Sequence, residues 1–116
     1  MCKWEAIALE RSVWQAGQQA LLVQITVAEV LRVRLTDLCG PQRGDAHSAF
    51  ARQTAMYLCR LVFDMRLGDI AMAFGRDRST ASHAIRRIEE AREDAVFDSR
   101  LAWLESALRQ AGGFHG

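Results

Sequence analysis

The sequence predicts an all-α protein, a small bundle of five or six helices that contains a helix-turn-helix. Apolar residues recur at the three- and four-residue spacing of amphipathic helices along most of the chain. Between Arg66 and Ile88, a glycine separates two short segments of this kind, as in two helices joined by a tight turn. With 116 residues, half of them hydrophobic, the chain suits one domain with a single core.

The first helix is expected over residues 3–19, where Gly17 weakens its end. Trp4 and Trp14 are expected to cover the core, because a tryptophan has a large apolar surface with one polar edge. The alternative is that these tryptophans contact another protein or a second copy of the chain.

A second helix is expected over residues 20–34, closed by Arg32 and Arg34 because a helix C-terminus favours positive charge. A proline between two glycines then predicts a loop over residues 39–46. The next helix is expected over residues 47–65.

That third helix has two faces. Its apolar face carries Phe50, Met56, Tyr57, Leu61 and Val62. Arg52, Gln53 and Arg60 lie on another side, which is expected to meet solvent. Side chains of this kind can donate hydrogen bonds to phosphate oxygens.

The segment from Arg66 to Ile88 predicts the helix-turn-helix itself. Its first helix has one apolar side, formed by Leu67, Ile70, Ala71 and Phe74. Gly75 is expected to end this helix in the left-handed conformation, and Asp77 is expected to cap the next one. The apolar stripe of the second helix is formed by Ala81, Ala84, Ile85, Ile88 and Ala91.

The opposite side of that second helix is polar. It carries Ser79, Ser82, His83 and Arg86, flanked by Arg78 and Arg87. A cation such as Arg78 in the first turn opposes the helix dipole by roughly 0.3–1 kcal/mol, which a functional role would explain. A helix-turn-helix uses the first residues of its second helix to reach base edges. The alternative is an ordinary solvated helix face.

The remaining residues are expected to close the bundle. Because they would repel a duplex, four acids are expected to point away from it: Glu89, Glu90, Glu93 and Asp94. The last helix is expected over residues 98–110, with Trp103 to one side and a tail that frays. Its inward face is formed by Leu101, Leu104, Ala107 and Leu108.

Three separated stretches, TVAEVLRVRLTDL, ARQTAMYLCR and FGRDRSTASHAIRRI, occur in this order. Together they resemble the C-terminal DNA-binding domain of the bacterial replication initiator DnaA, with FGRDRSTASHAIRRI similar to its signature. The resemblance divides the chain into an extra N-terminal helix (1–20), a helix-turn-helix domain (21–95) and a C-terminal helix with its tail (96–116).

This resemblance implies binding to double-stranded DNA. It places Arg52 and Gln53 at phosphates and Arg60 near the DNA backbone. From the helix face and the resemblance together, the residues expected at DNA are Arg43, Arg52, Gln53, Arg60, Arg76, Asp77, Arg78, Ser79, Thr80, Ser82, His83, Arg86 and Arg87.

Two departures from the family pattern alter that expectation. The family's loop is basic and sends an arginine into the minor groove, whereas only Arg43 remains here, with Asp45 nearby. Arg78 and Ser79 stand where the family has histidine and threonine. Arginine can bridge guanine O6 and N7, and serine lacks the methyl group that packs on thymine, so an altered base preference is expected.

Charge also argues for modest affinity. The net charge is only +1, whereas a DNA-binding module is expected to be clearly basic. Between Arg43 and Arg92 there are nine arginines and six acids, about +3 for that segment. Fewer phosphate contacts should weaken binding and reduce its salt dependence.

Enzymatic and membrane functions are not indicated. The sequence lacks a phosphate-binding G-x-x-x-x-G-K-[ST] loop, and neither a metal site nor another cofactor is expected. Cys2, Cys39 and Cys59 are expected to be reduced, mostly buried side chains. The early acids argue against a signal peptide, and no apolar run reaches the roughly 18 residues of a membrane span, so a cytoplasmic, nucleoid-associated protein is expected.

Two functions remain open from the sequence. The first is site-selective binding to DnaA-box-like duplexes, in regulating replication initiation or transcription. The second is a protein-interaction module that binds the initiator or one of its regulators, with weak or no DNA binding. A monomer or a homodimer is compatible with both.

Overall fold

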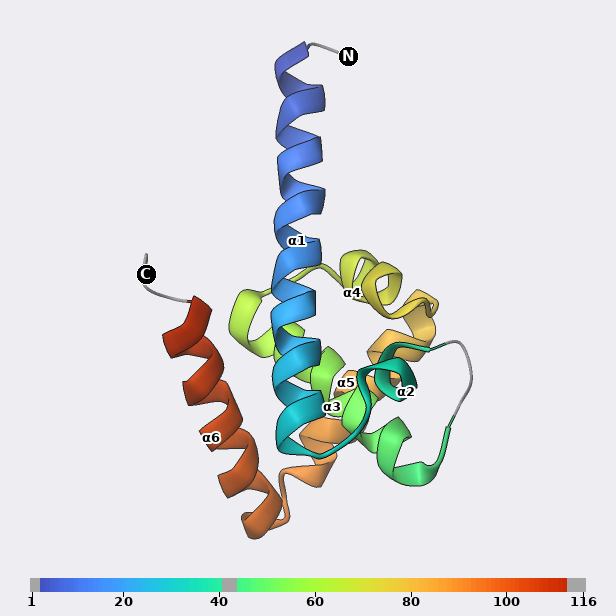
Figure 1. The fold of residues 1–116 in the computed structure, drawn as a ribbon, viewed down its shortest axis with the longest axis vertical. Coiled ribbons are helices and arrows are strands. Elements are labelled where there is room, and N and C mark those ends of the chain that lie inside the picture. Colours follow the sequence, from blue (N-terminus) through green and yellow to red (C-terminus); the bar gives the residue numbers. More distant parts are fainter. Residues whose placement is uncertain (1–2, 41–43, 113–116) are drawn as a thin grey trace.

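The computed structural model describes residues 3–40 and 44–112, with side chains from Trp14 to Ala111 inside those ranges. It contains α1 (Lys3–Val30), α2 (Leu35–Cys39), α3 (Ala46–Phe63), α4 (Leu67–Phe74), α5 (Arg78–Ala91) and α6 (Ala95–Gly112). Six helices and no strand occur in these ranges, and α4 and α5 form a helix-turn-helix (Figure 1). The predicted all-α class is therefore confirmed.

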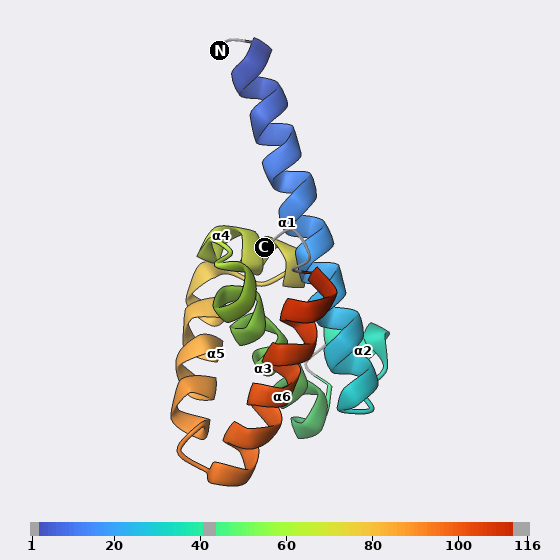
Figure 2. The same cartoon turned by 90° about the vertical axis from the view of Figure 1, so that its left-hand side faces the viewer.

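Helix α1 is continuous over 28 residues, so the prediction of two separate helices was wrong. A Cβ atom added at Gly17 would meet nothing within 4 Å, which shows that no turn or close contact forms there. A glycine inside a helix costs only about 1 kcal/mol, too little to end it. In both views, the N-terminal half of α1 stands clear of the other helices (Figures 1 and 2).

The two predictions tied to this helix also require correction. Trp14 does not cover the core, because its relative exposure is 69%. The side chain of Trp4 lies outside the described part of the chain. Arg32 and Arg34 follow the end of α1 and do not close it. Arg32 has φ +56°, and the turn there carries Val33 into the core.

Helix α3 runs through the middle of the bundle and packs against α1, α5, α2, α4 and α6. Its buried hydrophobic side chains are Ala51, Ala55, Met56, Tyr57, Leu58 and Cys59. The predicted apolar face is confirmed, with Phe50, Leu61 and Val62 packed partly buried against this core. Burial raises the pKa of the Cys59 thiol to about 12, in keeping with its expected role as a small buried side chain.

Helix α6 closes the bundle over the residues predicted to face inward. Leu101, Leu104 and Leu108 are buried, whereas Trp103 is exposed to one side, as predicted. The helix begins earlier than expected because the Asp94 carboxylate accepts hydrogen bonds from the N–H groups of Val96 and Phe97. The expected fraying concerns residues that mostly lie outside the described ranges, as do Cys2 and Arg43.

Candidate nucleic-acid interface

The turn between α4 and α5 is built as the sequence predicts. Gly75 adopts φ +63° and its N–H donates to the Met72 carbonyl at 3.2 Å, which ends α4. The Asp77 carboxylate accepts a hydrogen bond from the Thr80 N–H at 2.7 Å, which caps α5. Hydrogen bonds from Thr80 and Ser79 lower the pKa of Asp77.

Helix α5 has a buried face and an exposed face. Ala81, Ala84 and Ile88 are buried against the bundle, with relative exposures of 0%, 2% and 0%. The polar side chains on the exposed side are Arg78, Ser79, Thr80, His83, Arg86 and Arg87, with Ser82 partly exposed. The packing of one face thus fixes the direction in which the other presents its hydrogen-bond donors.

Beside α5, a hollow of about 440 Å³ separates the helix from the start of α3. Five of the residues predicted from the sequence line it: Arg52, Gln53, Arg76, Thr80 and His83. The other lining residues are Gly44, Asp45, Ala46, Ala49, Met56 and Ala84. The fold therefore brings these five predicted side chains together although they lie up to 31 positions apart in the sequence.

Arg78 does not line this hollow and lies against the first turn of α4. A Cβ atom added at Gly68 would come within 3.0 Å of the Arg78 Nη2 atom. The absence of a side chain at Gly68 therefore leaves space for the guanidinium group. The position of Arg78 depends on α4 as well as on its own helix.

Arg76 joins the turn to a distant part of the chain. Its guanidinium donates to the carbonyl of Phe74 at 3.0 Å and to that of Gly40 at 3.0 Å. The side chain is only partly exposed. It therefore holds the α4–α5 turn beside the end of α2.

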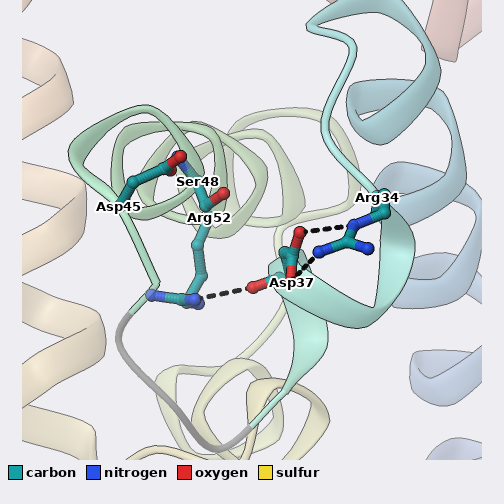
Figure 3. A network of polar contacts seen from close by, with 5 residues as sticks. All are labelled: Arg34, Asp37, Asp45, Ser48 and Arg52. Carbon is teal, nitrogen blue, oxygen red and sulfur yellow. Dashed lines mark hydrogen bonds and ion pairs between the residues drawn. The ribbon is translucent and has the colours of Figure 1, made fainter.

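The expectation that Arg52 lies on a solvent-exposed face was wrong, because its relative exposure is 6%. Its Nε and Nη2 atoms donate to the backbone carbonyls of Leu38 and Asp37 at 2.9 and 2.8 Å. Figure 3 shows this guanidinium pointing from α3 toward α2, whose Asp37 carboxylate also accepts from Arg34. The physical reason is that the single-turn helix α2 leaves carbonyl groups without intrahelical donors. Burial, followed by the nearby Arg76 charge, lowers the pKa of Arg52.

Comparison with known proteins shows to which family this chain belongs. Residues 21–88 match the model of the bacterial DnaA protein helix-turn-helix, which covers more than half of the chain. The chain belongs to the bacterial DnaA helix-turn-helix family. The resemblance on which the sequence analysis relied is thereby confirmed.

The relatives of this DnaA-family domain are chromosomal replication initiators. It is 41% identical over 90 residues to the chromosomal replication initiator protein DnaA of Ruegeria sp. (strain TM1040), covering 77% of this chain and 18% of that protein. It is 44% identical over 69 residues to the same protein of Tropheryma whipplei (strain Twist), covering 60% of this chain and 14% of that protein. The chain thus spans less than a fifth of these relatives.

Two solved structures share the fold of this DnaA-family domain. A crystal structure of a DNA replication initiation factor matches with a TM-score of 0.80 and 33% identity, over 89% of this chain and 32% of that one. Replication initiator DnaA bound to AMPPCP and single-stranded DNA matches with a TM-score of 0.73 and 33% identity, over 86% of this chain and 30% of that one.

Of the predicted residues that the structure describes, seven do not line the hollow: Arg60, Asp77, Arg78, Ser79, Ser82, Arg86 and Arg87. Arg60 is seven positions beyond Gln53 on α3, about 10 Å along the axis, and its Nη1 atom donates to the Met65 carbonyl at 2.8 Å. Its Nη1 atom also lies 3.7 Å from the Asp64 carboxylate. Arg43 lies outside the described residues, so the structure does not place it.

One residue of the site was missed from the sequence. Asp45 lines the hollow, and its carboxylate accepts a hydrogen bond from the Ser48 N–H at 2.8 Å, which caps α3. The hydrogen bonds from Ser48 are the main reason why the pKa of Asp45 is lowered. An aspartate three positions before a helical serine is an N-cap signal that the sequence already contained.

Proposed function

We propose that this chain binds double-stranded DNA with sequence preference by placing the start of α5 in the major groove. The observation that supports this most is the exposed row of donors on α5, opposite a face packed into the bundle through Ala81, Ala84 and Ile88, in a member of the DnaA helix-turn-helix family. A helix held in this way can enter a groove without rearranging the bundle.

The first two turns of α5 would read bases. Arg78 can donate two hydrogen bonds to guanine O6 and N7, and Ser79, Thr80 and His83 lie within one to two turns of it. A good bidentate contact is worth about 1–3 kcal/mol of discrimination against the wrong base. The preferred sites would resemble DnaA boxes but differ where Arg78 and Ser79 make contact.

Other residues would contact the DNA backbone. Arg86 and Arg87 are exposed further along α5, and Gln53 borders the hollow from α3. Asp77 would act indirectly by capping the reading helix. The guanidinium groups of Arg52 and Arg76 donate hydrogen bonds to backbone carbonyls. Fewer guanidinium groups are therefore available for phosphates than the sequence suggests, which supports moderate-to-low affinity for DNA.

The cellular role follows by analogy. The relatives are chromosomal replication initiators, and residues 21–95 of this chain are proposed to correspond to their DNA-binding module. We infer a regulator that acts in the cytoplasm, on the nucleoid, at DnaA-box-like sites in replication initiation or transcription. It would share those sites with an initiator.

Gel-shift titrations of two α5 variants test the DNA proposal. Arg78→Ala should relax the preference between a DnaA-box duplex and a scrambled one, because a base contact is lost. Arg87→Ala should weaken both duplexes alike, because a phosphate contact carries no sequence information. Arg100→Ala removes the same charge from the exposed surface of α6 and should change neither. Unchanged binding in both α5 variants would show that α5 does not read DNA.

A protein-interaction module is the second candidate. Trp103 is 61% exposed and borders a hollow of about 260 Å³ between α1 and α6, together with Val30, Leu31 and Leu104. Arg100 lines the same hollow, and such a largely apolar surface suits the replication initiator or one of its regulators as partner. Sedimentation of the chain with a purified initiator would favour this candidate if a complex forms while duplex binding is absent.

A further inference from the structure

The first turn of α4 leaves an open space that the guanidinium of Arg78 occupies. If a Cβ atom is added at Gly68, its three nearest heavy atoms all belong to that group: Nη2 at 3.0 Å, Nε at 3.2 Å and Cζ at 3.4 Å. These distances are shorter than the roughly 3.5–4.0 Å of an ordinary contact between non-bonded carbon atoms. The observed position of the Arg78 guanidinium is therefore compatible with glycine at position 68 and crowded by any larger residue.

The backbone of α4 does not itself require a glycine at position 68. Gly44 and Gly75 are the glycines with positive φ, whereas Gly68 lies within the helix Leu67–Phe74. Alanine favours a helix more than glycine does. The effect that distinguishes glycine from alanine at this position is thus the space that it leaves for Arg78.

The guanidinium of Arg78 lies beside α4 without being bonded to it. Within the described part of the chain, Arg78 forms no hydrogen bond or ion pair. Arg76, two positions earlier, instead donates to two backbone carbonyls. Asp69, the acid in the first turn of α4, borders a different hollow on the side of α1. The donors of Arg78 can therefore turn toward a ligand without breaking a bond inside the protein.

Helix dipoles do not hold the guanidinium of Arg78 in this place either. Arg78 is the first residue of α5, and its guanidinium lies against the first turn of α4. Both helix N-termini carry partial positive charge, which disfavours a nearby cation. The shape of α4 at Gly68 therefore defines where the group lies, and the acceptor atoms of a base would supply the attraction that the protein lacks.

We propose that Gly68 is a positioning residue for base readout, which fixes the reach of Arg78 from the neighbouring helix. This rests on the proposed function, in which Arg78 donates two hydrogen bonds to guanine. Such bonds require donor–acceptor distances of about 2.7–3.2 Å and nearly straight angles. A methyl group at position 68 would displace Nε and Nη2, the donor atoms nearest to it, and would leave the side chain less restricted before binding.

Gel-shift titration of Gly68→Ala with a DnaA-box duplex and a scrambled one tests this role. The ratio of the two affinities should fall by about threefold to tenfold, because a bidentate contact is weakened, while the affinity for the scrambled duplex stays unchanged. In an Arg78→Ala background, Gly68→Ala should not change the ratio further. Gly17→Ala is the matched control, since a Cβ atom there meets nothing within 4 Å, and it should leave the ratio unchanged.

Urea denaturation tests the contact itself without DNA. Gly68→Ala should raise the midpoint more in an Arg78→Ala background than in the wild type, because the new methyl group then has no guanidinium to displace. Circular dichroism should show the same helical content in all four proteins. An equal shift of the midpoint in both backgrounds would show that position 68 does not act on Arg78, and would overturn the proposal.

The DNA titrations separate failure of this proposal from failure of the proposed function. If Arg78→Ala lowers the ratio of affinities and Gly68→Ala does not, the role of Gly68 is refuted while the reading role of α5 stands. A Gly68→Ala protein that binds both duplexes more weakly, with an unchanged ratio, would also refute that role. If Arg78→Ala itself leaves the ratio unchanged, the proposed base contact fails, and the positioning role fails with it.

Discussion

The sequence predicts both Arg52 and Arg78 at DNA, but the two arginines differ in what they contact. Arg52 is buried and its guanidinium donates to two carbonyls of α2, 14 and 15 positions away. Arg78 is exposed and lies against Gly68 of the neighbouring helix. Residue type alone does not distinguish these roles, because both arginines lie on helices and both are expected at DNA from the sequence.

Replacement of Arg52 tests its structural role. Arg52→Met should lower the free energy of unfolding by about 1–3 kcal/mol, because one buried and one partly buried carbonyl lose their donors. Urea denaturation measures this loss. Arg100→Met, at an exposed position on α6, is the control and should have little effect. An Arg52→Met protein of full stability that no longer binds DNA would instead assign Arg52 to phosphate contact.

The cap of α5 should make stability depend on pH. The pKa of Asp77 is lowered in the folded protein, chiefly by the Thr80 N–H, so its charged form is favoured by folding. Its contribution is therefore complete above the unfolded pKa, about 3.9, and is lost as the pH falls through the folded pKa. Asp77→Ala should lower the melting temperature at pH 7 and make less difference near pH 3. An equal loss at both values would contradict this account.

At the scale of the elements, backbone conformation separates two glycines that the sequence treats alike. Gly17 lies inside α1 and Gly75 ends α4, and a Cβ atom at either position would meet nothing within 4 Å. Only Gly75 has a positive φ, +63°. Gly17 can therefore be replaced, whereas the turn that orients α5 requires a glycine at position 75.

The two alanine variants should shift stability in opposite directions. Gly17→Ala should raise the free energy of unfolding by about 1 kcal/mol, since alanine favours the helix. Gly75→Ala should lower it by about 1–2 kcal/mol, because an L-residue is strained in the left-handed region. Denaturant titration of both proteins checks the signs. A loss of stability in Gly17→Ala would show that α1 makes a close contact at that position.

For the whole molecule, local signals predicted the geometry of the helix-turn-helix. The apolar stripe of α5, the Gly75 stop and the Asp77 cap each depend on residues within one or two turns, so their spacing predicted them correctly. The unbroken α1, the burial of Arg52 and the bond from Arg76 to Gly40 depend on how distant segments pack. Such contacts have no signature in local spacing, which is why the sequence did not predict them.

The distribution of charge also belongs to this scale. The net charge of +1 leaves little general attraction to a polyanion, and two arginines of the site are hydrogen-bonded to backbone carbonyls. Under the proposed function, preference for a DNA site would therefore come mainly from the exposed side chains of α5. This makes the ratio between specific and non-specific binding more informative than either affinity alone.

Fluorescence anisotropy of two labelled duplexes, one with a DnaA box and one scrambled, tests this central claim most directly. The wild-type chain should bind the box more tightly at every salt concentration. Both affinities should fall as salt rises, with a slope of about 0.9 per phosphate contact in a logarithmic plot. Equal binding to the two duplexes, or no binding at low salt, would contradict the account.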